Sequence, residues 1–229
     1  MNDRPVLLVH GLASSFDHNW RSTGWVDILA HEGRAVVGVD LPGHGANSAQ
    51  DPAQTDRAAA ILAAIGDHAQ VDAVGFSAGG HALIAAAASA PRRFRKIALL
   101  GVGDGSARRG GAHSSNGEAA GIAAGLESET EPDDPTARVL WRLAARAGND
   151  RRAVAGYLRA PYPAVALADL AAIDVPVLVV LGDRDFAGPA DRLLAALPDA
   201  RLVTLRGVDH FGTPSDYGCI EAVTSFLAA

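Results

Sequence analysis

Three side chains that together could perform nucleophilic catalysis occur along the chain in the order serine, aspartate, histidine. Ser77 lies in the segment Gly-Phe-Ser-Ala-Gly, between an apolar run and a stretch of small residues. A serine hydroxyl is a weak nucleophile at neutral pH, so it needs a base to take its proton and an acid to orient that base. Asp185, four residues past the apolar run 176–181, and His210, five residues past 201–205, are the candidates for acid and base.

The residues around Ser77 predict a strand, a sharp turn and a helix. Gly75 and Gly79 flank the serine two residues away on each side, where larger side chains would collide across a strained turn. Glycine is abundant in this chain, so the pattern gains its weight from the predicted strand before it and helix after it. The competing interpretation is a buried turn serine. If Ser77 attacks a carbonyl, the amides of Ala78 and Leu12 are the expected donors to the oxyanion.

Composition limits the classes of protein to consider. The 229 residues carry a net charge of −6 with a pI near 5.7, which argues against a nucleic-acid-binding surface. Cys219 is the single cysteine, so no intrachain disulfide forms and a cysteine-based metal site is excluded. We find no apolar run long enough for a membrane span and no signal peptide, and therefore expect a cytoplasmic protein that needs no metal or cofactor.

Short apolar runs alternate with helical patterns, which predicts an α/β fold with a doubly wound parallel sheet. The expected strands are 6–9, 35–39, 71–75, 96–100, 176–181 and 201–205. The expected helices between and after them are 20–32, one capped by Thr55, 78–90, 190–197 and 216–228. Sites in such sheets lie beyond the carboxyl ends of the strands, which is where Ser77, Asp185 and His210 all fall.

The alternation breaks between the fourth and fifth strands. Residues 103–135 are rich in glycine, serine and acidic residues and are expected to form a long loop, followed by helices at 136–147, 150–159 and 167–173. We therefore divide the chain into a core of 1–103 and 173–229 and an insertion of 104–172 that lies over the sheet edge.

These motifs, in this order, resemble those of the α/β-hydrolases. The strand followed by His10-Gly11, the run Asp-Leu-Pro-Gly-His-Gly at 40–45, the Ser77 turn, Gly-Asp-Arg-Asp at 182–185 and Gly-Val-Asp-His at 207–210 all have counterparts there. The resemblance implies that Ser77, Asp185 and His210 are nucleophile, acid and base, and that 104–172 is a lid. It also implies that the first two strands of the family are missing, which leaves six strands in the order 2-1-3-4-5-6.

Some assignments stay open at this level. Asp183 or Asp104 could be the acid instead of Asp185, which the resemblance favours. Candidate residues lining a substrate pocket are Phe76, Trp141, Phe186 and Phe211, although aromatic residues more often belong to the core. The reaction we expect is hydrolysis of a small-molecule carboxylic ester through an acyl-enzyme. The alternatives are thioester, lactone or carbon–carbon bond hydrolysis on the same triad, or a hydrolase relative that binds a ligand with little turnover. The oligomeric state is not predicted.

Overall fold

The computed structural model describes residues 4–104, 116–161 and 165–229. The predicted insertion 104–172 therefore includes two stretches, 105–115 and 162–164, that lie outside the described residues. Of the helices that are described, none has the length and apolar character needed to cross a bilayer.

The centre of the molecule is a six-stranded sheet in which every neighbouring pair is parallel. Its order, β2-β1-β3-β4-β5-β6, confirms the predicted order and the predicted fold class. The strands are β1 (Val6–Val9), β2 (Val36–Val39), β3 (Val71–Phe76), β4 (Phe94–Leu100), β5 (Val177–Gly182) and β6 (Ala200–Leu205). Strands β1, β3 and β5 are completely buried, as expected of apolar strands covered on both faces.

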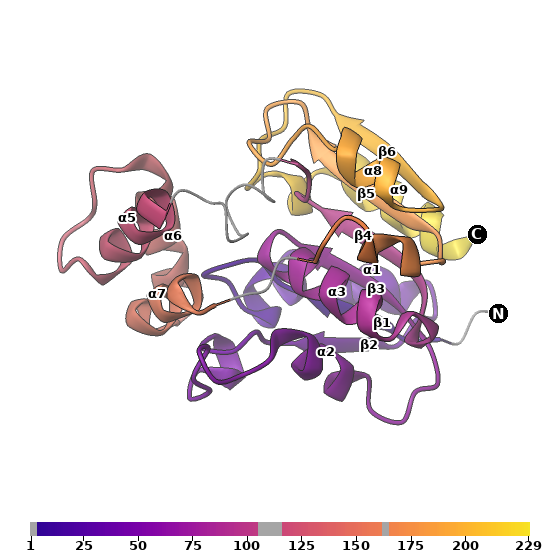
Figure 1. The fold of residues 1–229 in the computed structure, drawn as a ribbon, viewed down its shortest axis with the longest axis horizontal. Helices are drawn as coiled ribbons and strands as arrows, with labels where there is room; N and C mark the ends of the chain where they lie inside the picture. Colours follow the sequence, from indigo (N-terminus) through magenta and orange to yellow (C-terminus); the bar gives the residue numbers. More distant parts are fainter. Residues whose placement is uncertain (1–3, 105–115, 162–164) are drawn as a thin grey trace.

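Helices cover both faces of the sheet, and each face has its own hydrophobic cluster. Helices α2 (Arg57–Ile65), α3 (Ala78–Ser89) and α8 (Asp191–Ala196) pack on one face, and α1 (Trp25–His31) and α9 (Tyr217–Ala228) pack on the other. Side chains of β1 alternate between the two clusters, since Leu7 and Val9 belong to the first and Val6 and Leu8 to the second. The resulting three layers are visible in Figure 1.

The helical insertion between β4 and β5 forms a third hydrophobic cluster. It consists of α5 (Asn116–Glu127), α6 (Pro135–Arg146) and α7 (Arg151–Arg159), and is followed by the 3-10 helix Asp169–Ala172. Figure 1 shows these three helices grouped at the end of the sheet opposite the two termini, which is the end where the parallel strands finish. The insertion thus stands beside the edge of the sheet that carries Ser77.

Four details of the predicted elements were wrong. The predicted helix 167–173 is only a short 3-10 helix, Asp169–Ala172. The segment 116–127, expected within a loop, is α5. Its three glycines weaken the helical pattern in the sequence, yet Gly125 allows close packing, because a Cβ there would lie 2.7 Å from the Cβ of Ala137. Helix α2 is capped by the carboxylate of Asp56 rather than by Thr55. The predicted helix 20–32 is divided into a π-helical turn, Asp17–Arg21, and α1, because Gly24 between them has φ of 87°.

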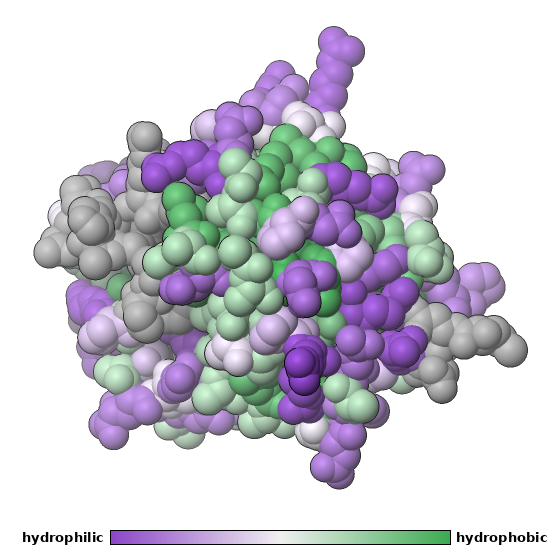
Figure 2. Space-filling model, turned by 45° about the vertical axis from the view of Figure 1, so that its right-hand side comes forward, coloured by the Kyte–Doolittle hydropathy of each residue, from purple (hydrophilic) through white to green (hydrophobic). Residues whose placement is uncertain are grey.

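The surface combines charged side chains with scattered apolar ones. Figure 2 shows one face, on which apolar residues gather near the centre among hydrophilic ones. The large apolar side chains with substantial exposure in the described residues are Val139, Leu167, Phe186, Leu202 and Tyr217. Phe186 is the one that follows Asp185, and it lies beside the candidate site described next.

Candidate active site

Ser77 lies between the end of β3 and the start of α3. Its backbone has φ of 49° and ψ of −114°, a conformation that residues other than glycine rarely adopt. Its neighbours have no room for larger residues. A Cβ at Gly75 would lie 2.8 Å from the Cα of Gly80, and one at Gly79 would lie 2.4 Å from the carbonyl oxygen of His10. The Ser77 amide donates to Leu100 O at 2.8 Å, which fixes the turn to β4. The strand, strained turn and helix predicted from the sequence are therefore present.

The structure brings the three predicted side chains together from three different strand ends. His210 Nε2 lies 2.9 Å from Ser77 Oγ, and His210 Nδ1 lies 2.8 Å from Asp185 Oδ1. Since a carboxylate only accepts, Nδ1 carries the proton and Nε2 presents its lone pair to the serine hydroxyl. Asp185 Oδ1 also accepts the Ala187 amide at 2.8 Å. This tautomer is the one that can remove a proton from Ser77.

The two other candidate acids are engaged elsewhere. Asp104 accepts hydrogen bonds from the amides of Arg192 and Leu193, both at 3.0 Å, and so caps the start of α8. Asp183 accepts the amide of Gly207 at 2.7 Å, which ties the loop after β5 to the loop after β6. Among the three aspartates, Asp185 is the one that contacts the imidazole of His210.

Aromatic rings and a glycine enclose the imidazole of His210. The ring centroids of Phe76 and Phe186 lie 5.1 Å and 4.1 Å from that of His210, and Phe211 meets it edge-on at 5.4 Å. Gly101, whose φ is 62°, leaves the space that the imidazole occupies, because a Cβ there would lie 3.0 Å from His210 Cε1. The imidazole is thereby held against the end of β4 while its Nε2 faces Ser77.

The orientation of the Leu12 amide is fixed through the carbonyl of Gly11, which belongs to the same peptide group. Gly11 O, in the same plane, is paired with His10 Nδ1 at 2.7 Å and accepts the Ser14 amide at 3.2 Å. Leu12 N and Ala78 N themselves have no hydrogen-bond partner within the described part of the chain. Gly79 lies against the carbonyls of Val9 and His10, which brings the loop after β1 next to the start of α3. Two unengaged amides therefore belong to segments that meet beside Ser77.

Two buried histidines brace the loop that carries Leu12. His10 Nε2 accepts the Leu41 amide at 3.0 Å, and His44 Nε2 accepts the Ala13 amide at 3.1 Å. Burial lowers the pKa of His10 to about 4 and that of His44 to about 3, so both stay neutral and keep an acceptor nitrogen at neutral pH. Ala13 has φ of 63°, an unfavourable conformation for alanine that this pairing helps to hold.

The predicted pocket residues fall in different environments. Phe76 is 7% exposed, so little of its surface is left for a substrate to contact. Phe186 is 38% exposed and packs 6.2 Å from Phe211, centroid to centroid. Trp141 donates to Ser128 O at 3.2 Å and has the Arg151 guanidinium 4.3 Å above its ring. The expectation that these four residues line a substrate pocket stays a prediction.

Apolar side chains of the core and of the helical insertion meet in the third hydrophobic cluster. Its partly buried members come from the Leu12 loop, from the residue after His210 and from all three helices of the insertion. They are Leu12, Ile122, Trp141, Leu143, Leu158 and Phe211. Within the described ranges, no group of three or more His, Cys, Asp or Glu residues is placed to hold a metal ion.

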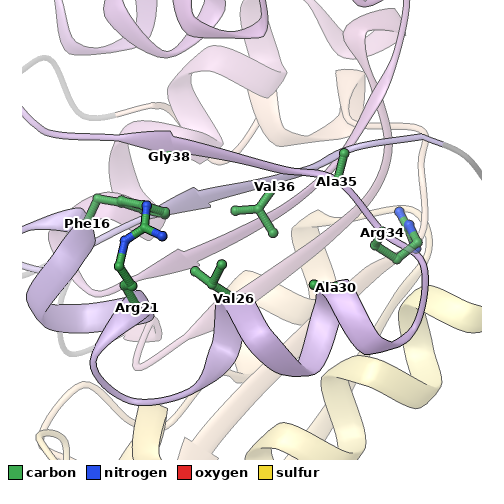
Figure 3. Close-up of a pocket in the computed structure, with 8 residues that line it drawn as sticks. All are labelled: Phe16, Arg21, Val26, Ala30, Arg34, Ala35, Val36 and Gly38. Carbon is green, nitrogen blue, oxygen red and sulfur yellow. The ribbon is translucent and has the colours of Figure 1, made fainter.

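A groove of about 440 Å³ lies away from these residues, between α1 and the edge strand β2 (Figure 3). Val26 and Val36 face one another across it, and Phe16 with Arg21 lies at one end. None of its lining residues is Ser77, Asp185, His210 or one of the amides described above, so we do not assign the candidate site to it.

Sequence reasoning missed two residues of this neighbourhood. Gly101 follows β4 directly and resembles any glycine that ends a strand, since its contact with His210 is not visible in the sequence. Asn149 lies in a Gly-Asn-Asp corner between α6 and α7, where asparagine is common for purely local reasons. Its side chain nevertheless reaches the Leu12 loop, with Nδ2 donating to Ala13 O at 3.0 Å.

Comparison with known proteins agrees with this arrangement. Residues 6–217 match the alpha/beta hydrolase family, and the chain belongs to that family. The proteins that it resembles include hydrolases of several kinds.

One curated relative is the 2-hydroxy-6-oxononadienedioate/2-hydroxy-6-oxononatrienedioate hydrolase of Burkholderia vietnamiensis, 33% identical over 111 residues. That match covers 44% of this chain and 36% of the relative, so it spans about a third of the relative's length. The enol-lactonase of Burkholderia xenovorans superposes with a TM-score of 0.75 and 21% identity, covering 100% of this chain and 93% of that one. A thermophilic esterase from Thermogutta terrifontis gives a TM-score of 0.70 and 20% identity, covering 98% and 89%. At these identities the two structures show a shared fold.

Proposed function

We propose that this protein hydrolyses carboxylic esters, with Ser77 as the nucleophile, His210 as the general base and Asp185 as the acid that orients the base. One observation carries the proposal. An unbroken hydrogen-bonded chain joins Asp185 Oδ1 to His210 Nδ1 at 2.8 Å and His210 Nε2 to Ser77 Oγ at 2.9 Å. The side chains of Asp185 and His210 are 0% and 5% exposed, so the charge that develops on the imidazolium is shielded from water and faces the carboxylate.

The proposed reaction uses each of these groups in turn. Ser77 Oγ attacks the ester carbonyl carbon while its proton passes to His210 Nε2. Negative charge develops on the carbonyl oxygen, and the amides of Leu12 and Ala78 are the donors assigned to it. The imidazolium then protonates the departing alkoxide oxygen, which leaves an acyl group on Ser77. A water molecule, deprotonated by the same Nε2, hydrolyses the acyl-enzyme and releases the acid.

The apolar side chains shared by the core and the helical insertion support an apolar acyl group. Leu12, Phe211 and Leu143 are partly exposed members of that cluster, so they offer surface that an acyl chain would cover. Covering apolar surface contributes about 25 cal/mol per Å², which gives affinity without a charged partner. We propose that the acyl side of the substrate contacts this cluster. The helical insertion would then act as a lid over the site.

A second candidate is hydrolysis of a carbon–carbon bond, which the relative from Burkholderia vietnamiensis supports by its name. In that reaction the leaving group is carbon and must take its proton on carbon, a step that an alkoxide does not require. The same triad could also hydrolyse thioesters or lactones. These substrates differ from simple esters in their leaving group and in the pocket that they require.

The test is covalent labelling followed by a panel of substrates. A fluorophosphonate should attach to Ser77 in the folded protein, as located by mass spectrometry, and the Ser77→Ala variant should take no label. p-Nitrophenyl esters of increasing acyl length, a thioester, a lactone and a 2-hydroxy-6-oxo-dienoate would then be compared by kcat/KM. Fastest turnover of the dienoate would replace ester hydrolysis by the second candidate. Ligand-induced thermal shifts with no label and no turnover would refute catalysis altogether.

A further inference from the structure

The corner between α6 and α7 places one buried carboxamide between two loops of the core. Asn149 is 8% exposed, and its Nδ2 donates to Ala13 O at 3.0 Å and to Ser14 O at 2.8 Å. Its Oδ1 accepts the Gly45 amide at 2.8 Å. Two carbonyls at one end and an N–H group at the other can be satisfied by a single orientation of the amide. The side chain is therefore a specific bridge from the helical insertion to both loops.

The backbone of the corner is itself fixed. The Asn149 amide donates to Ala144 O at 2.8 Å, and Gly148 adopts φ of 72°, which ends α6. Asp150 then caps α7 by accepting the Arg152 amide at 2.8 Å. The carboxamide of Asn149 thus extends from a rigid support between two helices, so its bonds can restrain the loops that it touches.

The loop that it touches carries the candidate oxyanion donor. Ala13, the residue after Leu12, is held in its strained conformation by hydrogen bonds on both sides. Its amide donates to His44 Nε2 at 3.1 Å, and its carbonyl accepts from Asn149 Nδ2 at 3.0 Å. Without the carboxamide, the carbonyls of Ala13 and Ser14 would lose this donor. Ala13 could then relax to a negative φ, and the direction of the Leu12 amide would change with it.

We propose that Asn149 is a positioning residue for the oxyanion site, through which the helical insertion sets the direction of the Leu12 N–H group. The proposal rests on the function proposed above, because it assigns Leu12 to the stabilisation of the oxyanion. It differs from a general role in stability, since its effect falls on the charged intermediate and leaves the triad unchanged.

The test compares Asn149→Ala and Asn149→Asp with the wild type. Asn149→Asp keeps an acceptor for Gly45 but replaces the two donated hydrogen bonds with a carboxylate facing carbonyl oxygens. Arg159→Ala is the matched control, because Arg159 pairs with Glu127 inside the insertion and touches neither loop. Each variant is measured for kcat, KM and the pH profile of an ester substrate. Inhibition by a trifluoromethyl ketone, whose adduct with Ser77 carries an oxyanion, is compared with inhibition by the product acid. Hydrogen exchange of amides 10–15 follows the loop directly.

We expect both Asn149 variants to lower kcat by ~10- to 100-fold, somewhat less than deletion of a donor, with little change in KM or in the shape of the pH profile. Trifluoromethyl ketone inhibition should weaken by a similar factor while inhibition by the product acid stays constant, and amides 10–15 should exchange faster. Arg159→Ala should change none of these. Unchanged exchange, or an unchanged kcat and inhibition ratio in Asn149→Ala, would overturn the inference. Wild-type protein that takes no label at Ser77 would instead refute the proposed function, and exchange would still show whether Asn149 holds the loop.

Discussion

Replacement of Gly101 by alanine should lower kcat while leaving the protein folded. Gly101 is buried at the end of β4, and its amide donates to Val180 O at 3.0 Å. A Cβ at this position would lie 2.9 Å from Phe76 Cε2, 3.0 Å from His210 Cε1 and 3.1 Å from His210 Nδ1. Both rings must therefore give way to the added methyl group, Phe76 because its contact is the shortest and the imidazole by a few tenths of an ångström.

The expected size of the effect has two separable parts. The φ of 62° at Gly101 is unfavourable for alanine by ~1–2 kcal/mol, which for a chain of this length lowers Tm by about 2–8 °C. The contact displaces an imidazole whose two nitrogens lie 2.9 Å from Ser77 Oγ and 2.8 Å from Asp185 Oδ1. Misplacement of a catalytic group by about 1 Å lowers the rate by ~100-fold. The displacement needed here is a few tenths of an ångström, so we expect kcat to fall by ~10-fold.

A second glycine provides the matched control. Gly24, before α1, has φ of 87°, and a Cβ there would meet no atom within 4 Å. Gly24→Ala should share the loss of Tm and retain kcat, whereas Gly101→Ala should lower both. The assay is ester turnover and fluorophosphonate labelling rate, with thermal melting measured on the same samples. If Gly101→Ala retained the wild-type kcat, the imidazole would not be held by this contact and the reasoning would fail.

Three further predictions concern the acid, the loop histidines and the insertion. Asp185→Asn should lower kcat by ~10⁴-fold, the size seen when a triad acid is amidated, whereas Asp104→Ala should cost ~1 kcal/mol of stability as a lost cap and leave kcat unchanged. Because the pKa of His44 is lowered to about 3 in the folded protein, unfolded chains bind the extra proton below pH 6.5. Stability should therefore fall as the pH drops from 7 to 4.5, by about 2.5 kcal/mol from this group, and His44→Gln should reduce that slope in urea titrations. Gly125→Ala should push α5 from α6 and lower Tm, whereas Gly121→Ala, with open space around its Cα, should raise it slightly.

The strands and the turn at Ser77 could be predicted because local pattern determines them, whereas the order of the strands followed from the resemblance to the α/β-hydrolases. Short buried runs follow directly from apolar composition, and parallel pairing brings all their carboxyl ends to one edge of the sheet. The side chains just past those ends, Ser77, Asp185 and His210, are then forced into the same neighbourhood. Distance from a strand end does not distinguish Asp185 from Asp183 or Asp104, so that choice depended on the resemblance to the family.

The parts that sequence analysis missed depend on contacts across long stretches of chain. Asn149 and Ala13 are 136 residues apart, and nothing in the Gly-Asn-Asp corner distinguishes a bridge from an ordinary turn. Gly101 is required by the rings of Phe76 and His210, and α5 is stabilised by helices that follow it. In each case tertiary packing, rather than propensity, decides the role of the residue.

The two halves of the candidate site are therefore supported differently. The side chains of the proposed triad extend from segments anchored to the sheet, since Ser77 N is bonded to β4 and Asp185 N to Gly182 at the end of β5. The Leu12 loop is held instead by side chains, His10 and His44 from the core and Asn149 from the helical insertion. A perturbation that loosens the contact of the Asn149 corner with the Leu12 loop should thus weaken stabilisation of the oxyanion before it affects proton transfer. In a series of such variants, kcat should fall in parallel with trifluoromethyl ketone affinity while the pH profile of kcat/KM keeps its shape.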